Sequence, residues 1–343
     1  MKGYEIMLNI GIIGAGRIGK VHAESITYHV KDARVAAIAD PFMNETTTAW
    51  AEGLGIQKIY TDYRSILQDD EIQAVLICSS TDTHADIAIE SIKANKHVFC
   101  EKPVSQDLNK IKAVIDALDA SKVKFQVGFN RRFDHNFEAV RNAVKEGKIG
   151  DVHIVKVTSR DPEAPPLEYV KVSGGMFLDM TIHDFDMVRY LTSSDVVEVY
   201  ASGTALVNPA IQDVGDIDTA IINMKLANGA LAVIDNSRQA DYGYDQRAEV
   251  FGSKGQIAVT NDTGSTAVLS TANGVTGEKP LYFFLERYMA SFSKEVSLFV
   301  QAVLNDTEVP VNINDGLQPV LIAKAAKKSM EENRPVLLSE IVM

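Results

Sequence analysis

Cysteine is scarce in this sequence. Its 343 residues include two, Cys78 and Cys100, and each lies in an apolar run typical of a buried strand. Neither a disulfide framework nor a CxxC metal pair can be built from two such residues. The seven histidines lack H-x-x-x-H and H-E-x-x-H spacing, so the sequence indicates no metal site. The alternative is a chance site formed by Asp179, His183 and a distant carboxylate.

Positive charge is also in short supply. The chain has 34 Lys and Arg against 46 Asp and Glu, which gives a net charge of −12. Such a chain is poorly suited to bind nucleic-acid phosphates or an anionic membrane. No apolar segment approaches the length of a bilayer span, and no basic segment followed by an apolar stretch marks a signal peptide. These absences predict a cytoplasmic protein with neither a nucleic acid nor a membrane as partner.

The first third of the chain alternates short apolar runs with amphipathic segments. A chain of 343 residues exceeds what one hydrophobic core usually organises, so we expect two domains. Strands that alternate with helices predict parallel βαβ units. We therefore expect an α/β Rossmann dinucleotide-binding domain over residues 1–128, with strands at 8–13, 34–39, 74–78, 97–100 and 124–127 and helices at 17–30, 44–54, 83–93 and 107–121.

After Gly128 the pattern changes to successive strands with period-two alternation, which is typical of an antiparallel sheet. We expect an α+β domain with a large, mostly antiparallel open sheet over residues 129–343, with strands at 152–158, 196–202, 219–225, 230–236, 247–252 and 256–260 and helices at 133–145, 177–191 and 318–332. Few helices remain to cover both faces of this sheet. An uncovered apolar face predicts a homo-oligomer.

A glycine motif follows the first predicted strand. Gly14, Gly16 and Gly19, with Arg17 and Ile18 between them, form G-x-G-x-x-G between a strand and a helix. These glycines permit a tight turn, approach of the backbone to a pyrophosphate, and close packing of helix on strand. The start of the helix favours phosphate charge. The motif predicts dinucleotide binding; the alternative is that the glycines only mark a turn.

Asp40 ends the second predicted strand, 21 residues after Gly19. A carboxylate at this place can accept hydrogen bonds from ribose hydroxyls and would repel a 2′-phosphate. The sequence therefore favours NAD over NADP. The alternative is that Asp40 and Pro41 only begin a turn.

Lys102 lies in Glu101-Lys102-Pro103, directly after the strand predicted at 97–100. Ligands of open α/β sheets bind at this carboxyl edge. A lysine there can reach a substrate hydroxyl and the nicotinamide ribose as a flexible donor. The alternative is a solvated surface lysine.

Asp179 and His183 are four residues apart and would share one face of the helix predicted at 177–191. Oxidation of an alcohol needs a base for the hydroxyl proton, and histidine titrates in the useful range. A neighbouring carboxylate can orient the imidazole. The alternative is a capping aspartate beside a core histidine, and Asp184 and Asp186 leave open which carboxylate faces the substrate.

Together these motifs resemble the glucose–fructose oxidoreductase/inositol dehydrogenase/rhizopine catabolism (Gfo/Idh/MocA) family. The resemblance covers essentially the whole chain, and a subgroup of bacterial inositol 2-dehydrogenases is the most similar. The motifs that carry it are Gly14 to Gly19, Asp40, Glu101 to Pro103, Gly128 to Asp134, the Asp179 and His183 pair, and the segments Ser159 to Tyr169, Ser173 to Gly175, Ile182 to Asp186 and Tyr242 to Asp245.

The resemblance implies NAD-dependent oxidation of myo-inositol to 2-keto-myo-inositol (scyllo-inosose) in inositol catabolism, by a homotetramer. It implies His183 as general base, Asp179 as its partner and Lys102 as donor to substrate and cofactor. The remaining implied contacts are Glu101, Ser79, Ser80 and Thr81 with the cofactor, and Arg131, Asp161 and Tyr244 with the substrate.

The stereoisomer stays open, because some inositol dehydrogenases have asparagine where this chain has Asp161. One alternative is the same chemistry on scyllo-inositol or on a pyranose such as glucose. A second is a sensor that binds the nicotinamide cofactor without turnover. The presence of lysine, aspartate and histidine together disfavours the sensor.

Overall fold

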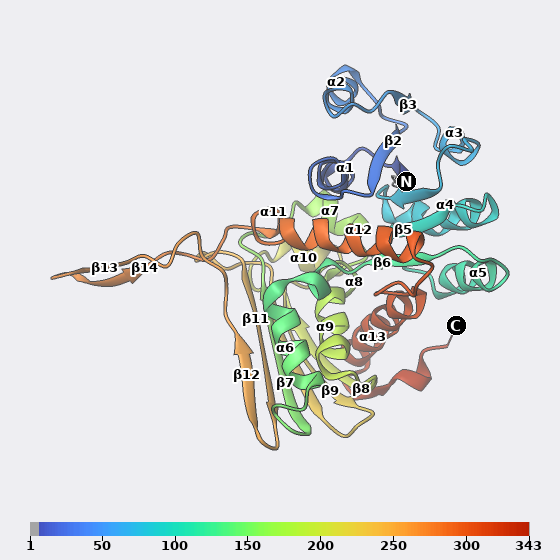
Figure 1. Cartoon of the computed structure of the whole chain (residues 1–343). Helices are drawn as coiled ribbons and strands as arrows, with labels where there is room; N and C mark the ends of the chain where they lie inside the picture. Colours follow the sequence, from blue (N-terminus) through green and yellow to red (C-terminus); the bar gives the residue numbers. More distant parts are fainter. Residues whose placement is uncertain (1–6, 343) are drawn as a thin grey trace. The chain divides into compact units, whose positions relative to one another are not determined.

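A computed structural model describes residues 7–342 of the chain. Within this range the residues group into two compact units (Figure 1). The first unit comprises residues 7–133 and 289–318, and the second comprises residues 134–288 and 319–342. Among the helices of residues 7–342, none is long and apolar enough to cross a membrane.

The first unit contains a six-stranded sheet in which every strand pair is parallel. Its strand order is β3-β2-β1-β4-β5-β6, the order of the doubly wound dinucleotide-binding fold. The predicted Rossmann fold is therefore confirmed. The strands are β1 Leu8–Ile13, β2 Ala33–Ala39, β3 Lys58–Tyr60, β4 Ala74–Ile77, β5 His97–Glu101 and β6 Phe125–Gly128. Strand β3 was not predicted from the sequence, because it is only three half-buried residues long.

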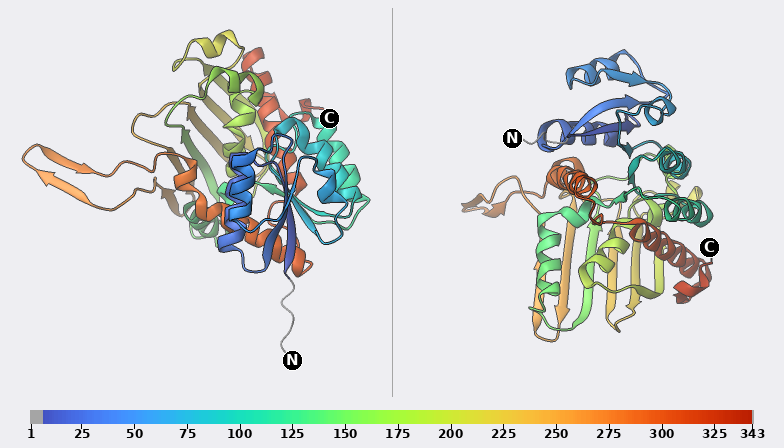
Figure 2. Two further views of the ribbon diagram at one scale, coloured as in Figure 1. Left: turned by 90° about the horizontal axis from the view of Figure 1, so that it is seen from above. Right: turned by 45° about the vertical axis from the view of Figure 1, so that its right-hand side comes forward.

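Helices α1 Arg17–His29, α2 Glu45–Gly53, α3 Arg64–Leu67, α4 Thr81–Lys93 and α5 Leu108–Asp119 connect these strands, and η1 Asn130–Phe133 follows them. A further helix, α12 Met289–Leu304, belongs to the same unit and packs on α1 (Figure 2). Its Val296, Phe299 and Val300 are fully buried in the core of this unit. The sequence analysis placed a single domain boundary at residue 128, so the membership of α12 in the first unit was not predicted. Sequence periodicity indicates only local structure.

The second unit contains a seven-stranded sheet in the order β12-β11-β7-β10-β9-β8-β15. Only β7 and β10 pair in parallel, and the other pairs are antiparallel. The expected large, mostly antiparallel sheet is therefore confirmed. Its strands are β7 Val152–Arg160, β8 Val196–Thr204, β9 Thr219–Leu226, β10 Leu231–Ser237, β11 Asp245–Gly252, β12 Gly255–Val259 and β15 Val336–Leu337.

Helices cover one face of this sheet (Figure 2). Helix α6 contacts β11 and β12, and α9 contacts β7. The strands alternate buried and exposed residues, as β9 shows most regularly, so the other face is open. The helices and remaining strands are α6 His135–Lys145, α7 Leu167–Ser173, α8 Met176–Asp179, α9 Ile182–Thr192, α10 Ala210–Asp213, α11 Phe284–Arg287, α13 Ile313–Glu332, η2 Leu338–Glu340, β13 Val268–Thr271 and β14 Gly274–Gly277.

The helix expected at 177–191 is interrupted, and this corrects one sequence prediction. Asp179 ends α8, whereas His183 is the second residue of α9. Between them, the N–H of Thr181 donates to the carbonyl of Met176, five residues earlier, at 3.0 Å. Such a wide turn inserts an extra residue into a helix and is frequent at functional sites. Asp179 and His183 therefore do not follow the simple four-residue spacing of one α-helix.

Candidate active site

The glycine motif forms a tight loop between β1 and α1. Gly14 has a φ of +102°, and a Cβ there would lie 2.6 Å from the backbone of Cys78. A Cβ on Gly19 would lie 1.9 Å from the carbonyl oxygen of Gly14, whereas a Cβ on Gly16 would meet nothing within 4 Å. Gly14 and Gly19 are thus required for packing, and the space beside Gly16 is open to a ligand.

Asp40 lies beside this loop. Its carboxylate accepts hydrogen bonds from the backbone N–H groups of Ala15 at 2.7 Å and Phe42 at 2.8 Å. The side chain is half-buried, and each carboxylate oxygen has a second lone pair for a ribose hydroxyl. Arg17 and Ile18 begin α1 after the N-cap Gly16, and the backbone N–H groups of a first helical turn favour phosphate.

Two further loops at this edge are joined by a histidine that the sequence analysis did not single out. The ring nitrogens of His84 contact the carbonyl oxygens of Pro103 at 2.9 Å and Ser79 at 3.0 Å. Ser80 is the N-cap of α4, and Thr81 is its first residue. The loop after β4 is thereby tied to the segment after β5.

Glu101 ends β5, and its side chain is mostly buried. Lys102 follows and is half-exposed. Arg131 lies in η1, just after β6, and is 3% exposed. All of these residues follow the carboxyl ends of parallel strands. We call this side of the first unit the cofactor edge: Gly14, Gly16, Arg17, Ile18, Gly19, Asp40, Ser79, Ser80, Thr81, Glu101, Lys102 and Arg131.

Three polar residues lie together at one edge of the second sheet. Arg160, the last residue of β7, pairs with Ser237 of β10 and Asp245 of β11. Asp161 follows Arg160, Arg238 follows Ser237, and Tyr244 precedes Asp245. The strand register therefore places Asp161, Arg238 and Tyr244 side by side. We call these three, with Asp179 and His183, the polar edge.

Asp179 is held by an ion pair that the sequence did not predict. Both terminal nitrogens of Arg238 lie 3.1 Å from Oδ2 of Asp179, and the Tyr169 hydroxyl donates to Oδ1 at 2.7 Å. Arg238 is 1% exposed. The ion pair connects α8 with the end of β10. The role of Asp179 as partner of His183 stays a prediction.

The neighbouring carboxylate Asp184 stabilises the fold of the second unit through hydrogen bonds. It accepts hydrogen bonds from Ser159 at 2.5 Å and from Asn236 at 2.9 Å, and it is fully buried. These bonds hold α9 on β7 and β10. Asp186 is also fully buried, whereas His183 is half-exposed. Of these three residues of α9, only His183 is open to a ligand.

Tyr244 is 5% exposed and packs edge-on against Phe283 and Tyr288. Its neighbour Asp245 anchors the start of β11. Burial alone would raise the pKa of Asp245, but hydrogen bonds from Arg247, Tyr242 and Asn261 outweigh burial and lower the pKa. Asp245 is thus an ionised carboxylate next to Tyr244 in the chain.

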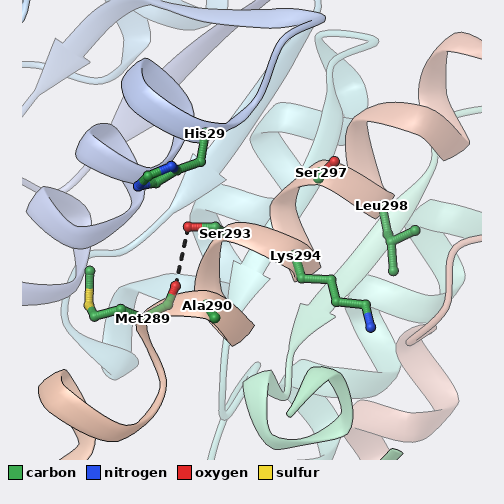
Figure 3. A pocket seen from close by; sticks show the side chains of 7 residues that line it. All are labelled: His29, Met289, Ala290, Ser293, Lys294, Ser297 and Leu298. Carbon is green, nitrogen blue, oxygen red and sulfur yellow. Dashed lines mark hydrogen bonds between the residues drawn. The ribbon is translucent and has the colours of Figure 1, made fainter. Parts of the chain in front are cut away.

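A surface hollow of the first unit lies apart from the cofactor edge. It is formed by the end of α1 and the outer side of α12 (Figure 3). The Gly16 loop is at the opposite end of α1, so this hollow does not belong to the dinucleotide site. Its lining residues are His29, Met289, Ala290, Ser293, Lys294, Ser297 and Leu298.

Two groups of side chains in the described part of the chain bring together atoms that metals bind: His22, Glu101 and Glu295, and Asp134, His135 and Asp262. In the second group, Arg287 already pairs with Asp134 and lies 2.8 Å from Asp262. A guanidinium ion thus neutralises these carboxylates.

The cofactor edge fits a dinucleotide. Gly14 and Gly19 allow close packing of the backbone, and the space beside Gly16 is open. The Asp40 carboxylate lies beside the loop. Fold and loop together define a dinucleotide-binding domain of the kind found in NAD-dependent oxidoreductases. Residues 8–129 match the oxidoreductase family with an NAD-binding Rossmann fold, and residues 137–258 match the GFO/IDH/MocA C-terminal domain. The chain belongs to the Gfo/Idh/MocA oxidoreductase family, as the sequence motifs indicated, and its cofactor is NAD.

Relatives are similar along nearly the whole chain. Myo-inositol 2-dehydrogenase of Thermotoga maritima is 47% identical over 98% of this chain and 100% of its own. Inositol 2-dehydrogenase of Rhizobium meliloti is 43% identical over 97% of this chain and 99% of its own. The structure of scyllo-inositol dehydrogenase from Lactobacillus casei with NAD(H) and scyllo-inositol has a TM-score of 0.90 and 30% identity, and covers 97% of this chain and 99% of its own.

Proposed function

We propose that this protein is an NAD-dependent inositol 2-dehydrogenase that oxidises myo-inositol to 2-keto-myo-inositol. The observation that carries the proposal is the 47% identity with the Thermotoga enzyme over both chains. A role in inositol catabolism and a cytoplasmic location follow as proposals from the same resemblance. Lys102, Asp179 and His183 supply the donor, the carboxylate and the base that such chemistry needs.

In this mechanism His183 accepts the proton of the substrate hydroxyl while the C–H bond of the same carbon breaks. NAD, when bound, accepts the hydride. The carbon and oxygen then share a double bond, and the product is a ketone. Lys102 donates a hydrogen bond to the reacting oxygen. Asp179 stabilises the protonated imidazole, and Arg238 holds the Asp179 carboxylate in place.

Substrate recognition is assigned to Arg131, Asp161 and Tyr244. A cyclic polyol presents only hydroxyl groups, so selectivity depends on donors and acceptors that are costly to leave unpaired. Arg131 and Tyr244 are buried, and Asp161 is half-buried. Arg131 donates, Asp161 accepts, and the Tyr244 hydroxyl can do both.

The closest rival is oxidation of scyllo-inositol or a pyranose, since a scyllo-inositol dehydrogenase shares this fold at 30% identity. Purified enzyme is mixed with NAD and, separately, with myo-inositol, scyllo-inositol or glucose, and NADH absorbance is followed. We expect the highest kcat/KM with myo-inositol. No rate with any inositol would contradict the proposal, and a higher value with another substrate would favour the rival.

We also propose that the open face of the second sheet is an interface in a homo-oligomer, a tetramer. Phe251, Ile154 and Leu231 lie in register across β11, β7 and β10 and are at least 40% exposed. An apolar row of this kind favours a second copy as partner. Light scattering at micromolar concentration is expected to give the mass of a tetramer, and a stable monomer would refute the interface.

A further inference from the structure

A cluster of buried polar side chains lies beneath the cofactor edge, within the first unit. His22 of α1 and Glu295 of α12 are 0% exposed, as is Gln126 of β6, and Glu101 of β5 is 9% exposed. The family resemblance implies Glu101 only as a cofactor contact. It gives no role to the other three.

The hydrogen bonds of this cluster leave one carboxyl group unexplained. Nε2 of His22 lies 2.7 Å from Oε1 of Glu101, and Nε2 of Gln126 donates to the backbone carbonyl of Glu295 at 3.0 Å. Both carboxyl oxygens of Glu295 are buried without a hydrogen-bond partner among the described residues, as are Nδ1 of His22 and Oε1 of Gln126. Buried polar atoms of this kind call for a physical explanation.

The surroundings of the cluster are apolar. The His22 ring packs edge-on against Phe99 and Phe292, with centroids 5.1 and 5.7 Å away. The other titratable groups in and around the cluster are Glu101, His22, Cys78 and Cys100. Burial raises the pKa of both thiols. Burial and then the Glu101 charge raise the pKa of Glu295 well above its usual range.

A tetrahedral zinc ion does not account for the cluster. One ligand atom each from His22, Glu101 and Glu295 lie within 4.8 Å of one another. Two ligands bound at about 2.0–2.2 Å to one tetrahedral zinc ion are separated by roughly 3.4 Å. The 2.7 Å between His22 and Glu101 is shorter and corresponds to an N–H···O hydrogen bond. With His22 as the donor, Glu101 is the acceptor of this hydrogen bond.

We propose that Glu295 is a positioning residue that stays an uncharged acid, whose O–H is directed to the Glu101 carboxylate and, together with His22, fixes Glu101 and the adjoining Lys102. This inference rests on the proposed function for the role of Lys102, but not for the buried proton. A second negative charge at Glu295 would instead repel Glu101 across an apolar space.

Close contacts hold the backbone on both sides of Lys102 in place. On one side, the Glu101 carboxyl group packs against Gly128, where a Cβ would come within 3.1 Å of it. On the other side, His84 contacts the carbonyl oxygen of Pro103 at 2.9 Å. Displacement of Glu101 would therefore be transmitted directly to Lys102, which has only one peptide unit on each side to absorb it.

Infrared spectroscopy of the wild type and of Glu295→Gln tests the buried proton. We expect the wild type to show the carbonyl band of a protonated carboxyl group at neutral pH, and Glu295→Gln to lack it. The matched control Glu308→Gln changes an exposed residue of the same unit and should keep the band. Absence of the band in the wild type, its persistence in Glu295→Gln, or one bound metal ion per chain would overturn the proposal.

The stability of the fold supplies a second readout. Above the ordinary carboxyl pKa of 4.5, the folded chain keeps a proton that the unfolded chain releases, so unfolding becomes more favourable as pH rises. The unfolding constant of the wild type should therefore rise up to tenfold per pH unit relative to that of Glu295→Gln. Parallel pH profiles for the two proteins would contradict a buried acid.

Activity tests the positioning role. Glu295→Met keeps a similar volume but removes the donor, and we expect kcat for inositol oxidation to fall about 10- to 100-fold, with a smaller change in KM for NAD. Glu295→Gln retains a donor and should recover most of this loss. Unchanged kcat in Glu295→Met would refute positioning. If the wild type oxidises no inositol while the infrared band and the pH dependence behave as expected, the proposed function fails and the buried acid stands.

Discussion

The cofactor edge and the polar edge are built from different parts of the chain. At the cofactor edge, backbone geometry dominates: Gly14 and Gly19 leave no room for a Cβ, and Gly16 is open. At the polar edge, side chains dominate, and Arg238 and Tyr169 both hold Asp179. Backbone N–H groups bind any phosphate of suitable shape, whereas paired side chains distinguish one pattern of hydroxyls from another. On the proposed function, we therefore expect the first edge to serve a shared cofactor and the second to set selectivity and chemistry.

The largest effect is expected at the polar edge. His183→Ala removes the proposed base, and kcat for inositol oxidation should fall by roughly 10²–10⁴. NAD affinity should hardly change, because the cofactor edge is intact. Steady-state NADH formation and a fluorescence titration with NAD measure the two quantities. The control His29→Ala alters an exposed histidine at the end of α1 and should behave as the wild type. Full activity of His183→Ala would assign the base to another residue.

The cofactor edge could be predicted from sequence because its signals are local. Gly14 to Gly19 occupy a fixed spacing between a strand and a helix, and Asp40 follows the next strand. Each inference needed only neighbouring residues and the rule that parallel strands end at one edge. The contacts of these residues with NAD stay predictions.

The polar edge could be predicted only in part. Arg238 binds Asp179 from 59 residues further along the chain, and nothing in the local pattern around Arg238 marks it as a partner. The wide turn that ends at Thr181 likewise cannot be predicted by counting residues at helical spacing. Helix α12 returns to the first unit from far along the chain, so Glu295 could not be connected with Glu101. Such long-range pairings depend on tertiary packing, which periodicity does not report.

A smaller effect is expected when the ion pair of the polar edge is broken. Arg238→Met leaves the Asp179 carboxylate without its guanidinium partner and should lower the free energy of unfolding by about 3 kcal/mol. This loss of unfolding free energy lies at the low end of the range expected for a broken buried ion pair, because 15% of the Asp179 side chain is exposed. Urea denaturation measures the change. In the double variant with Asp179→Asn, much of the loss should be recovered, and strictly additive losses would show that the pair is not coupled.

The smallest effect is expected at Asp40, the carboxylate beside the glycine loop. Asp40→Ser removes a carboxylate that can bind the ribose hydroxyls, and hydrogen bonds to a charged group contribute about 1.5–3 kcal/mol. Affinity for NAD should therefore fall about 10- to 150-fold, and affinity for NADP should rise because a repulsive charge is gone. Fluorescence titration with each cofactor measures both changes. Since His183 and Lys102 are unaltered, kcat at saturating NAD should change much less than affinity. An unchanged ratio of the two affinities would show that backbone alone sets cofactor choice at this edge.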